Sequence, residues 1–308
     1  MSTVQGFVNI KKALSTLSPK QVREMSQQPL HIALNASSPE SYERMENFFL
    51  RDLSAARRRE SSYSLTRGAA VGGSYDLVIY DESLPAPPHA VVFEHDRPQH
   101  LVSRVLDKHF DLGVPLARSF VPFRRPFIER VISKTARENT LFSITTALPD
   151  VIPNIIELPW AVAEFASDTA FLTMNQVRMA FLIAAASDRE VGYMQQKPEI
   201  ATVVGSAFGW RALARQLVSK VPFGGGLIAK AGIAYAGTKV LGLSLDHYYG
   251  IGFSYTRAER DRLYADAFRQ GKKVAQRILS YVRPDLAAKY AAEAAQSLPR
   301  PVQSRVRG

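Results

Sequence analysis

The pattern of apolar and polar positions changes about a third of the way along the chain. In residues 29–122, short apolar runs alternate with segments whose apolar residues follow helical spacing. This alternation is typical of a parallel sheet covered by helices. From Pro126 onward almost every apolar pattern is helical. We therefore expect an α/β plus all-α fold, in which a small doubly wound, mostly parallel sheet domain precedes a helical bundle domain.

The first part contains three strand candidates, at 30–34, 75–81 and 90–93. Ser38 followed by Pro39 predicts a helix start, because serine is a favoured N-cap and proline fits the first helical position. The composition of the remaining segments predicts an exposed loop over 55–73, a helix over 99–110 and a short strand over 114–120.

The second part predicts helices over 127–142, 161–186 and 199–218, separated by proline-containing turns. The last long helix has the clearest start, because Thr256 with Glu259 three residues later forms a capping box. Its predicted buried side contains Leu263, Ala267, Val274 and Ile278. The chain therefore divides into a helical lead-in (1–28), an α/β domain (29–122), a helical domain (123–283), and a C-terminal helix with a basic tail (284–308).

Composition narrows the classes of function. The 308 residues contain no cysteine, which excludes disulfides, thiolate metal sites and cysteine nucleophiles. The net charge of +11 favours anionic partners, such as nucleic acid, acidic proteins or an anionic membrane surface. The N-terminus lacks the apolar region of a secretory signal, so we expect a cytoplasmic protein.

Two stretches of the helical part, LTMNQVRMAFLIAAASDREVG (172–192) and GSAFGWRALARQLVSKVPFGGGLIAKAGIAYAGT (205–238), resemble the bacterial YcjF-like domain of unknown function. The resemblance extends over roughly 139–277. It implies a membrane-associated domain that often follows a GTP-binding domain, and it implies no activity. The residues that carry the family motifs are Thr173, Asn175, Gln176, Arg178, Gly209, Trp210, Arg211, Gly224, Gly225, Gly226 and Lys230.

A GTPase-like domain would need a phosphate-binding loop after its first strand, with glycine amides and a lysine. The chain has Asn-Ala-Ser-Ser-Pro-Glu-Ser at residues 35–41, without glycine or lysine. Asp81, at the end of the second predicted strand, matches the position of a magnesium-organising aspartate. We therefore expect a degenerate domain without a cofactor. Asp81 would bind a nucleotide-associated metal only if the domain is a divergent nucleotide-binding enzyme.

Other polar residues have simpler interpretations than ligand sites. His95, Asp96 and His100 are the right types for a metal site, but their spacing matches no known ligand pattern, so solvated loop histidines are favoured. Asp168 and Arg178 lie on different faces of one apolar helix, so they need different partners. A buried hydrogen-bonded network joining this helix to its neighbours is favoured over a ligand site.

Two features bear on membrane contact. Residues 227–245 form the most apolar candidate for a membrane span, although Lys230 and Lys239 oppose simple insertion and a soluble hairpin explains the small residues equally well. The last long helix carries a basic stripe that suits an anionic surface. Its members are Arg262, Arg269, Lys273 and Arg277.

Together these patterns predict a non-catalytic scaffold or accessory protein at the inner face of the cytoplasmic membrane, acting with a GTPase encoded elsewhere. The alternatives are a divergent nucleotide-binding enzyme and, third, a basic nucleic-acid-binding protein. Nucleic acid is disfavoured, because the sequence has no helix-turn-helix, zinc-finger or RNP motif. No oligomeric state follows from the sequence.

Overall fold

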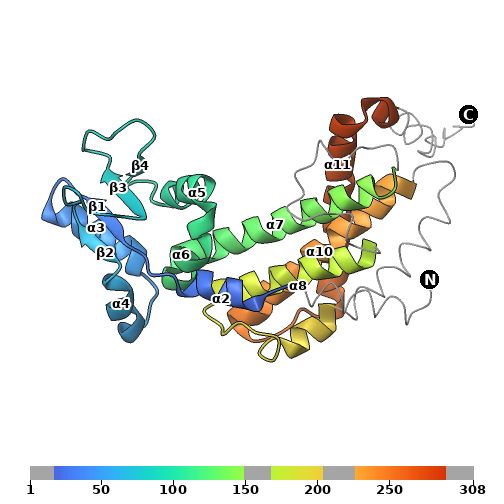
Figure 1. The fold of residues 1–308 in the computed structure, drawn as a ribbon, viewed down its shortest axis with the longest axis horizontal. Helices are drawn as coiled ribbons and strands as arrows, with labels where there is room; N and C mark the ends of the chain where they lie inside the picture. The colour runs from blue at the N-terminus through green and yellow to red at the C-terminus, as the bar shows by residue number, and fades with distance from the viewer. Residues whose placement is uncertain (1–16, 149–167, 204–225, 289–308) are drawn as a thin grey trace, which may run out of the picture.

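The computed structural model describes residues 17–148, 168–203 and 226–288. It confirms the expected fold class, a small parallel sheet with helices followed by a helical bundle (Figure 1). The sheet order is β2-β1-β3-β4, and all pairs are parallel. Its strands are β1 (Ile32–Asn35), β2 (Leu65–Arg67), β3 (Leu77–Asp81) and β4 (Val91–Phe93). The helices of this part are α3 (Pro39–Leu50), α4 (Ala55–Ser62), α5 (Gln99–Lys108) and the 3-10 turn η1 (Phe110–Leu112). Helix α2 (Pro19–Gln27) precedes the sheet in the sequence and packs against later helices of the chain.

The three predicted strands are present as β1, β3 and β4, and Ser38 caps α3 by accepting a hydrogen bond from the Ser41 amide. The central strand β1 is buried on both faces, as expected for a parallel sheet under helices. The chain leaves β1 toward β2 on one side and reaches β3 on the other. The carboxyl ends of β1 and β3 are thus the switch point, where open α/β sheets bind ligands.

Two predicted segments are wrong. Residues 55–73 do not form an exposed loop: they contain α4, capped by Ser54, and β2, whose buried Leu65 pairs with Ile32. Residues 114–120 are not a strand but most of α6 (Gly113–Ser119). Short apolar runs do not distinguish a strand from a buried helix, and Pro115 fits the first helical turn, where its missing N–H has no partner.

Among the residues described, the helical part contains four long helices and shorter helical stretches at 197–203 and 284–288. The predicted helix starting at 127 begins six residues earlier, with Pro122 in its first turn. The expected turns around Pro149, Pro153 and Pro159 lie outside the described residues, as do 161–167 and 204–218 of the predicted helices. The long helices are α7 (Val121–Thr145), α8 (Asp168–Ala186), α10 (Gly226–Ile251) and α11 (Arg257–Val282).

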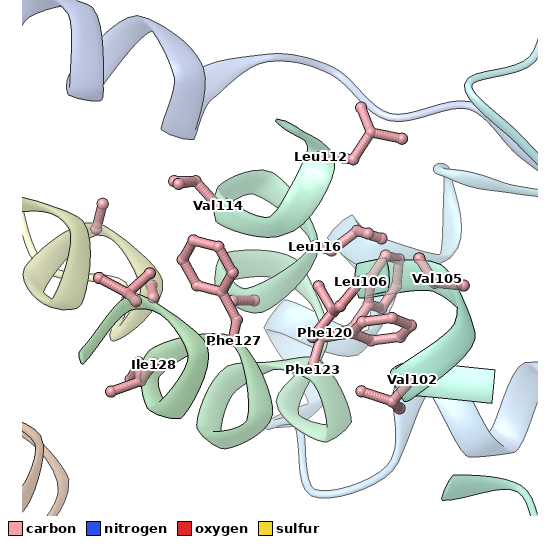
Figure 2. Close-up of a cluster of buried hydrophobic side chains, with 14 of the residues drawn as sticks. Val102, Val105, Leu106, Leu112, Val114, Leu116, Phe120, Phe123, Phe127 and Ile128 are labelled. Carbon is pink, nitrogen blue, oxygen red and sulfur yellow. The ribbon is translucent and has the colours of Figure 1, made fainter. Parts of the chain in front are cut away.

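One apolar core runs through both parts of the chain. At the junction of α6 and α7, Phe120 and Phe123 pack against Phe49 of α3, with ring centroids 5.1 and 5.7 Å apart. Figure 2 shows these rings beside Val102, Val105 and Leu106 of α5, with Phe127 directed toward Val114. The same core continues to side chains of α8 and α10. The sheet and the bundle are therefore joined by packing as well as by the chain.

Helices α10 and α11 approach each other closely. The capping box at Thr256 is confirmed, with Glu259 accepting from the Thr256 amide at 2.8 Å. Ala267 is buried as predicted, but Leu263, Val274 and Ile278 are only half-buried. Beyond Ala267 the buried side of α11 is displaced by one position, and the small residue Gly271 on it lets the backbones of α10 and α11 come together. The buried residues are Ala267, Gly271, Ala275 and Leu279.

We expect Gly271→Ala to destabilise the protein. A Cβ at Gly271 would lie 2.8 Å from both the Gly232 carbonyl oxygen and the Tyr235 Cβ, so one helix must shift. Overpacking of this kind costs about 1–3 kcal/mol. Gly250→Ala is the matched control, since nothing lies within 4 Å of its Cβ and alanine favours a helix. In urea denaturation, the free energy of unfolding should fall for Gly271→Ala and rise slightly for Gly250→Ala. A Gly271→Ala protein as stable as the control would contradict this packing.

Candidate functional site: the carboxyl edge of the sheet

Asp81 ends β3 at the switch point, and it is fully buried. Its two oxygens accept five hydrogen bonds, all from serines: Ser37 after β1, Ser41 in the first turn of α3, and Ser83 after β3. Oδ2 accepts from the Ser37 hydroxyl at 2.7 Å, the Ser37 amide at 3.3 Å and the Ser41 hydroxyl. Oδ1 accepts from the amide and the hydroxyl of Ser83, both at 2.9 Å. The chain itself therefore occupies the positions that a metal ion or its water ligands would need.

These donors determine the ionisation of the group. Burial raises the pKa of the Asp81 carboxyl, but the hydrogen bonds from Ser41, Ser83 and Ser37 outweigh it and hold the pKa well below its ordinary value. A buried carboxylate is costly unless it is neutralised or fully hydrogen-bonded. Here the serine donors favour the charged form of Asp81.

His95 completes the cluster from the end of β4. Its Nε2 lies 3.5 Å from Asp81 Oδ1 and 3.3 Å from Ser41 Oγ, and its ring packs edge-on against Phe93. In a Ser-His-Asp triad the histidine lies between the serine hydroxyl and the carboxylate. In this cluster the Ser41 hydroxyl donates directly to Asp81, and Ser41 is only 1% exposed. The arrangement thus lacks an accessible, activated nucleophile.

An open hollow of about 490 Å³ adjoins the cluster. It is lined by Asn35, Ala36, Arg67, Gly68, Tyr80, Leu84 and Pro85. Two amides beside it are already used: Gly68 N donates to the Leu34 carbonyl and Ala69 N to the Asn35 side chain. Arg67 supplies the one charged side chain among the lining residues.

The histidines near the cluster do not form a metal centre with the residues that were predicted as candidates. His100 Nδ1 lies 3.2 Å from Glu94, which also pairs with Arg104 and Arg97. Asp96 is exposed. Across the described ranges, no three histidine or carboxylate side chains converge as metal ligands.

The predicted polar network is confirmed for Asn175 and Gln176. Asn175 donates to Asn139 at 3.0 Å, while Asn139 and Gln176 both donate to the Thr238 hydroxyl, at 2.9 and 3.1 Å. Thr238 in turn donates to the Ala234 carbonyl. The network is buried and joins α7, α8 and α10. Thr173 is buried nearby, and its hydroxyl has no hydrogen-bond partner among the described residues.

The other motif residues are spread over the helices. Arg178 is half-buried on α8, near Glu138 of α7. Gly226 is the first residue of α10, and Lys230 lies one turn later. Asp168 is the first residue of α8, and its side chain is not among those that the structure describes. Gly209, Trp210, Arg211, Gly224 and Gly225 also lie outside the described residues.

Of the two features predicted to bear on membrane contact, residues 227–245 are mostly buried, and the basic stripe of α11 is exposed. Residues 227–245 belong to α10, most of whose side chains are buried between α7, α8 and α11. No helix in the described part of the chain has both the length and the hydropathy needed to cross a bilayer. Arg262, Arg269, Lys273 and Arg277 are all exposed on α11, on the side opposite its buried small residues.

No protein-family model, curated protein or solved structure matches this chain. The resemblance to the YcjF-like domain therefore stays a prediction from the quoted motifs.

Sequence reasoning identified Asp81 but missed its partners. In the sequence, residues 35–41 stood out because they contain neither glycine nor lysine. In the structure, Ser37 and Ser41 of this segment donate hydrogen bonds to Asp81. A detectable signal was the presence of serines at positions 37, 41 and 83, next to the ends of two adjacent parallel strands. Asn139 and Thr238 were also missed; their signal was a polar residue within an otherwise apolar helical pattern.

We expect Asp81→Asn to lower the free energy of unfolding at neutral pH by about 2–4 kcal/mol, because the serine donors lose a charged acceptor. The folded pKa lies below the unfolded value, so the stabilisation is present above about pH 4 and is lost as the pH falls further. Denaturation measured at several pH values from 7 to 3 should therefore show that the free energy of unfolding changes less with pH in the variant than in the parent. The exposed Asp96→Asn is the control; equal effects of both variants would refute this role.

The polar network predicts opposite effects for one chemical change at two positions. Thr238→Val leaves two buried amides without an acceptor and should cost about 1–3 kcal/mol. Thr173→Val removes a buried hydroxyl that has no partner in the described residues, so it should be neutral or stabilising. Thermal and urea unfolding of both variants would test the assignment, which fails if Thr173→Val is the more damaging of the two.

Proposed function

We propose that the protein is a non-catalytic scaffold that meets the anionic inner face of the cytoplasmic membrane. The observation that carries the non-catalytic part is Asp81. Its carboxylate is buried and saturated by Ser37, Ser41 and Ser83, so the edge of the sheet that would hold a nucleotide and its magnesium is occupied by the chain.

The membrane part of the proposal is supported by α11. This helix carries seven basic and three acidic side chains, and no acidic residue follows Asp266 within it. Arg269, Lys273 and Arg277 are exposed along one side of this second half. Basic residues near an anionic lipid surface each contribute about 1 kcal/mol to binding.

The test is co-sedimentation of the full chain with phosphatidylglycerol-containing vesicles and with neutral vesicles, at low and high salt. We expect binding that requires the anionic lipid and weakens as salt is added. Replacing Arg269, Lys273 and Arg277 by Glu should reduce the partition coefficient by at least about a hundredfold. Replacing the exposed Arg44, Arg58 and Arg59 by Glu changes the net charge equally, and it should have a much smaller effect.

Three outcomes would contradict the proposal. Equal losses in the two triple variants would show that net charge, and not the α11 surface, determines binding. Salt-sensitive binding of generic DNA without vesicle binding would assign the basic surface to nucleic acid. Saturable binding of magnesium-GTP that Asp81→Ala abolishes would support the divergent nucleotide-binding enzyme.

A further inference from the structure

A large groove lies between the sheet part and the bundle, and it shares Arg277 with the basic stripe of α11. Its floor is the outer side of α7, one wall is α5 with η1, and the other is α11, as Figure 1 lets the reader follow. The volume is about 1170 Å³. The lining residues are Ser103, Phe110, Pro126, Glu129, Arg130, Ser133, Lys134, Arg137, Glu138, Leu141, Val274, Arg277 and Ile278. We call this feature the α7 groove.

The α7 groove has unbalanced positive charge. Of its four basic side chains, Arg130 pairs with Asp107 at 2.6 Å and Lys134 lies over the Phe110 ring. Arg137 and Arg277 make no ion pair within the described ranges. Its two acidic residues do not neutralise them.

Neither acidic residue of the α7 groove pairs with Arg137 or Arg277. Glu129 pairs with Arg125 at 3.1 Å. Burial raises the pKa of Glu138, and the nearby Lys134 and Arg178 only partly oppose this rise. The two arginines are thus available to an acidic ligand.

The shape of the α7 groove fits a helix. The floor extends from Pro126 to Leu141, which at 1.5 Å per residue is about 22 Å. A helix with its side chains is about 10–12 Å wide, so one helix can lie across α7 between the two walls. Apolar groups are also presented there, among them Phe110, Leu141 and Val274. Recognition of an amphipathic helix uses this combination of an apolar groove and charged rims.

We propose that the α7 groove binds an acidic amphipathic helix of a partner protein, with acidic side chains on Arg137 and Arg277 and apolar side chains on the floor. The inference deepens the proposed scaffold function and rests on it. A planar bilayer is the less suitable occupant, because the two walls keep its surface away from the floor. The exposed stripe of α11 is the surface that a bilayer can reach.

The probe is a fluorescein-labelled, designed helical peptide of about 16 residues with one leucine face and one glutamate face. Its counterpart carries lysine in place of glutamate. Titrated with the full chain, the acidic peptide should show saturable anisotropy and the basic peptide should not. Arg137→Glu with Arg277→Glu should weaken acidic-peptide binding by at least about tenfold. Arg58→Glu with Arg59→Glu on α4 is the charge-matched control and should stay within about twofold.

A second variant separates docking in the groove from general charge attraction. Ser133 is half-buried in the lining, so Ser133→Trp would fill the groove without changing the charge. We expect it to weaken acidic-peptide binding by about tenfold as well. Circular dichroism and the urea midpoint of each variant would show that the fold is retained.

The inference is overturned if the acidic peptide does not saturate, if Ser133→Trp binds it like the parent, or if both arginine pairs have equal effects. The vesicle assay separates this failure from failure of the proposed function. Ser133→Trp should leave binding to phosphatidylglycerol vesicles unchanged. Lost peptide binding with intact vesicle binding supports the α7 groove as a separate site. Loss of both in this variant would assign the groove to lipid and overturn the proposal.

Discussion

The packing of Phe120 and Phe123 against Phe49 is the contact on which the architecture depends. Helix α7 begins beside the sheet and ends in the bundle. Its buried residues from Phe123 to Ile132 belong to the core shared by both parts, whereas Phe142 and Ile144 belong to smaller clusters of the bundle. Large aromatic side chains bury much apolar area and interlock at fixed angles, which opposes rotation of one part against the other. The position of α5 relative to α7, and with it one wall of the α7 groove, follows from this junction, whereas α11, the other wall, is held by its packing on α10.

The burial of Asp81 shows how a ligand-binding edge can become a structural one. A carboxylate at the end of a parallel strand needs donors, and in many α/β proteins a cation or its waters supply part of them. In this chain three serines supply them, from the segments that follow β1 and β3 and from the first turn of α3. The cluster is therefore better suited to keeping the loops in one conformation than to exchanging ligands.

Sequence reasoning succeeded where one local rule determines the result. The capping box at Thr256, the N-cap at Ser38 and the apolar strand ending at Asp81 each follow from a few neighbouring residues. It failed for α6, where five consecutive buried residues removed the periodicity, and for α4, which lies on the surface and has little apolar pattern. The site at Asp81 was predicted only in part, because a local rule identifies the aspartate but not the donors that lie far from it in the sequence. Asp81 could be found from its strand, and Ser83 lies only two residues away, but Ser37 and Ser41 reach Asp81 from a distant part of the sequence.

The hydrogen bonds at Thr238 affect which register the helices of the bundle adopt relative to one another. Helices α8 and α10 are apolar on nearly every side, and hydrophobic burial does not depend on direction. Sliding one helix along another by a turn would bury a similar area, so burial alone leaves several registers of similar energy. The amides of Asn139 and Gln176 reach the Thr238 hydroxyl in one register only. We infer that these polar groups contribute conformational specificity more than net stability, as buried polar residues do at coiled-coil interfaces.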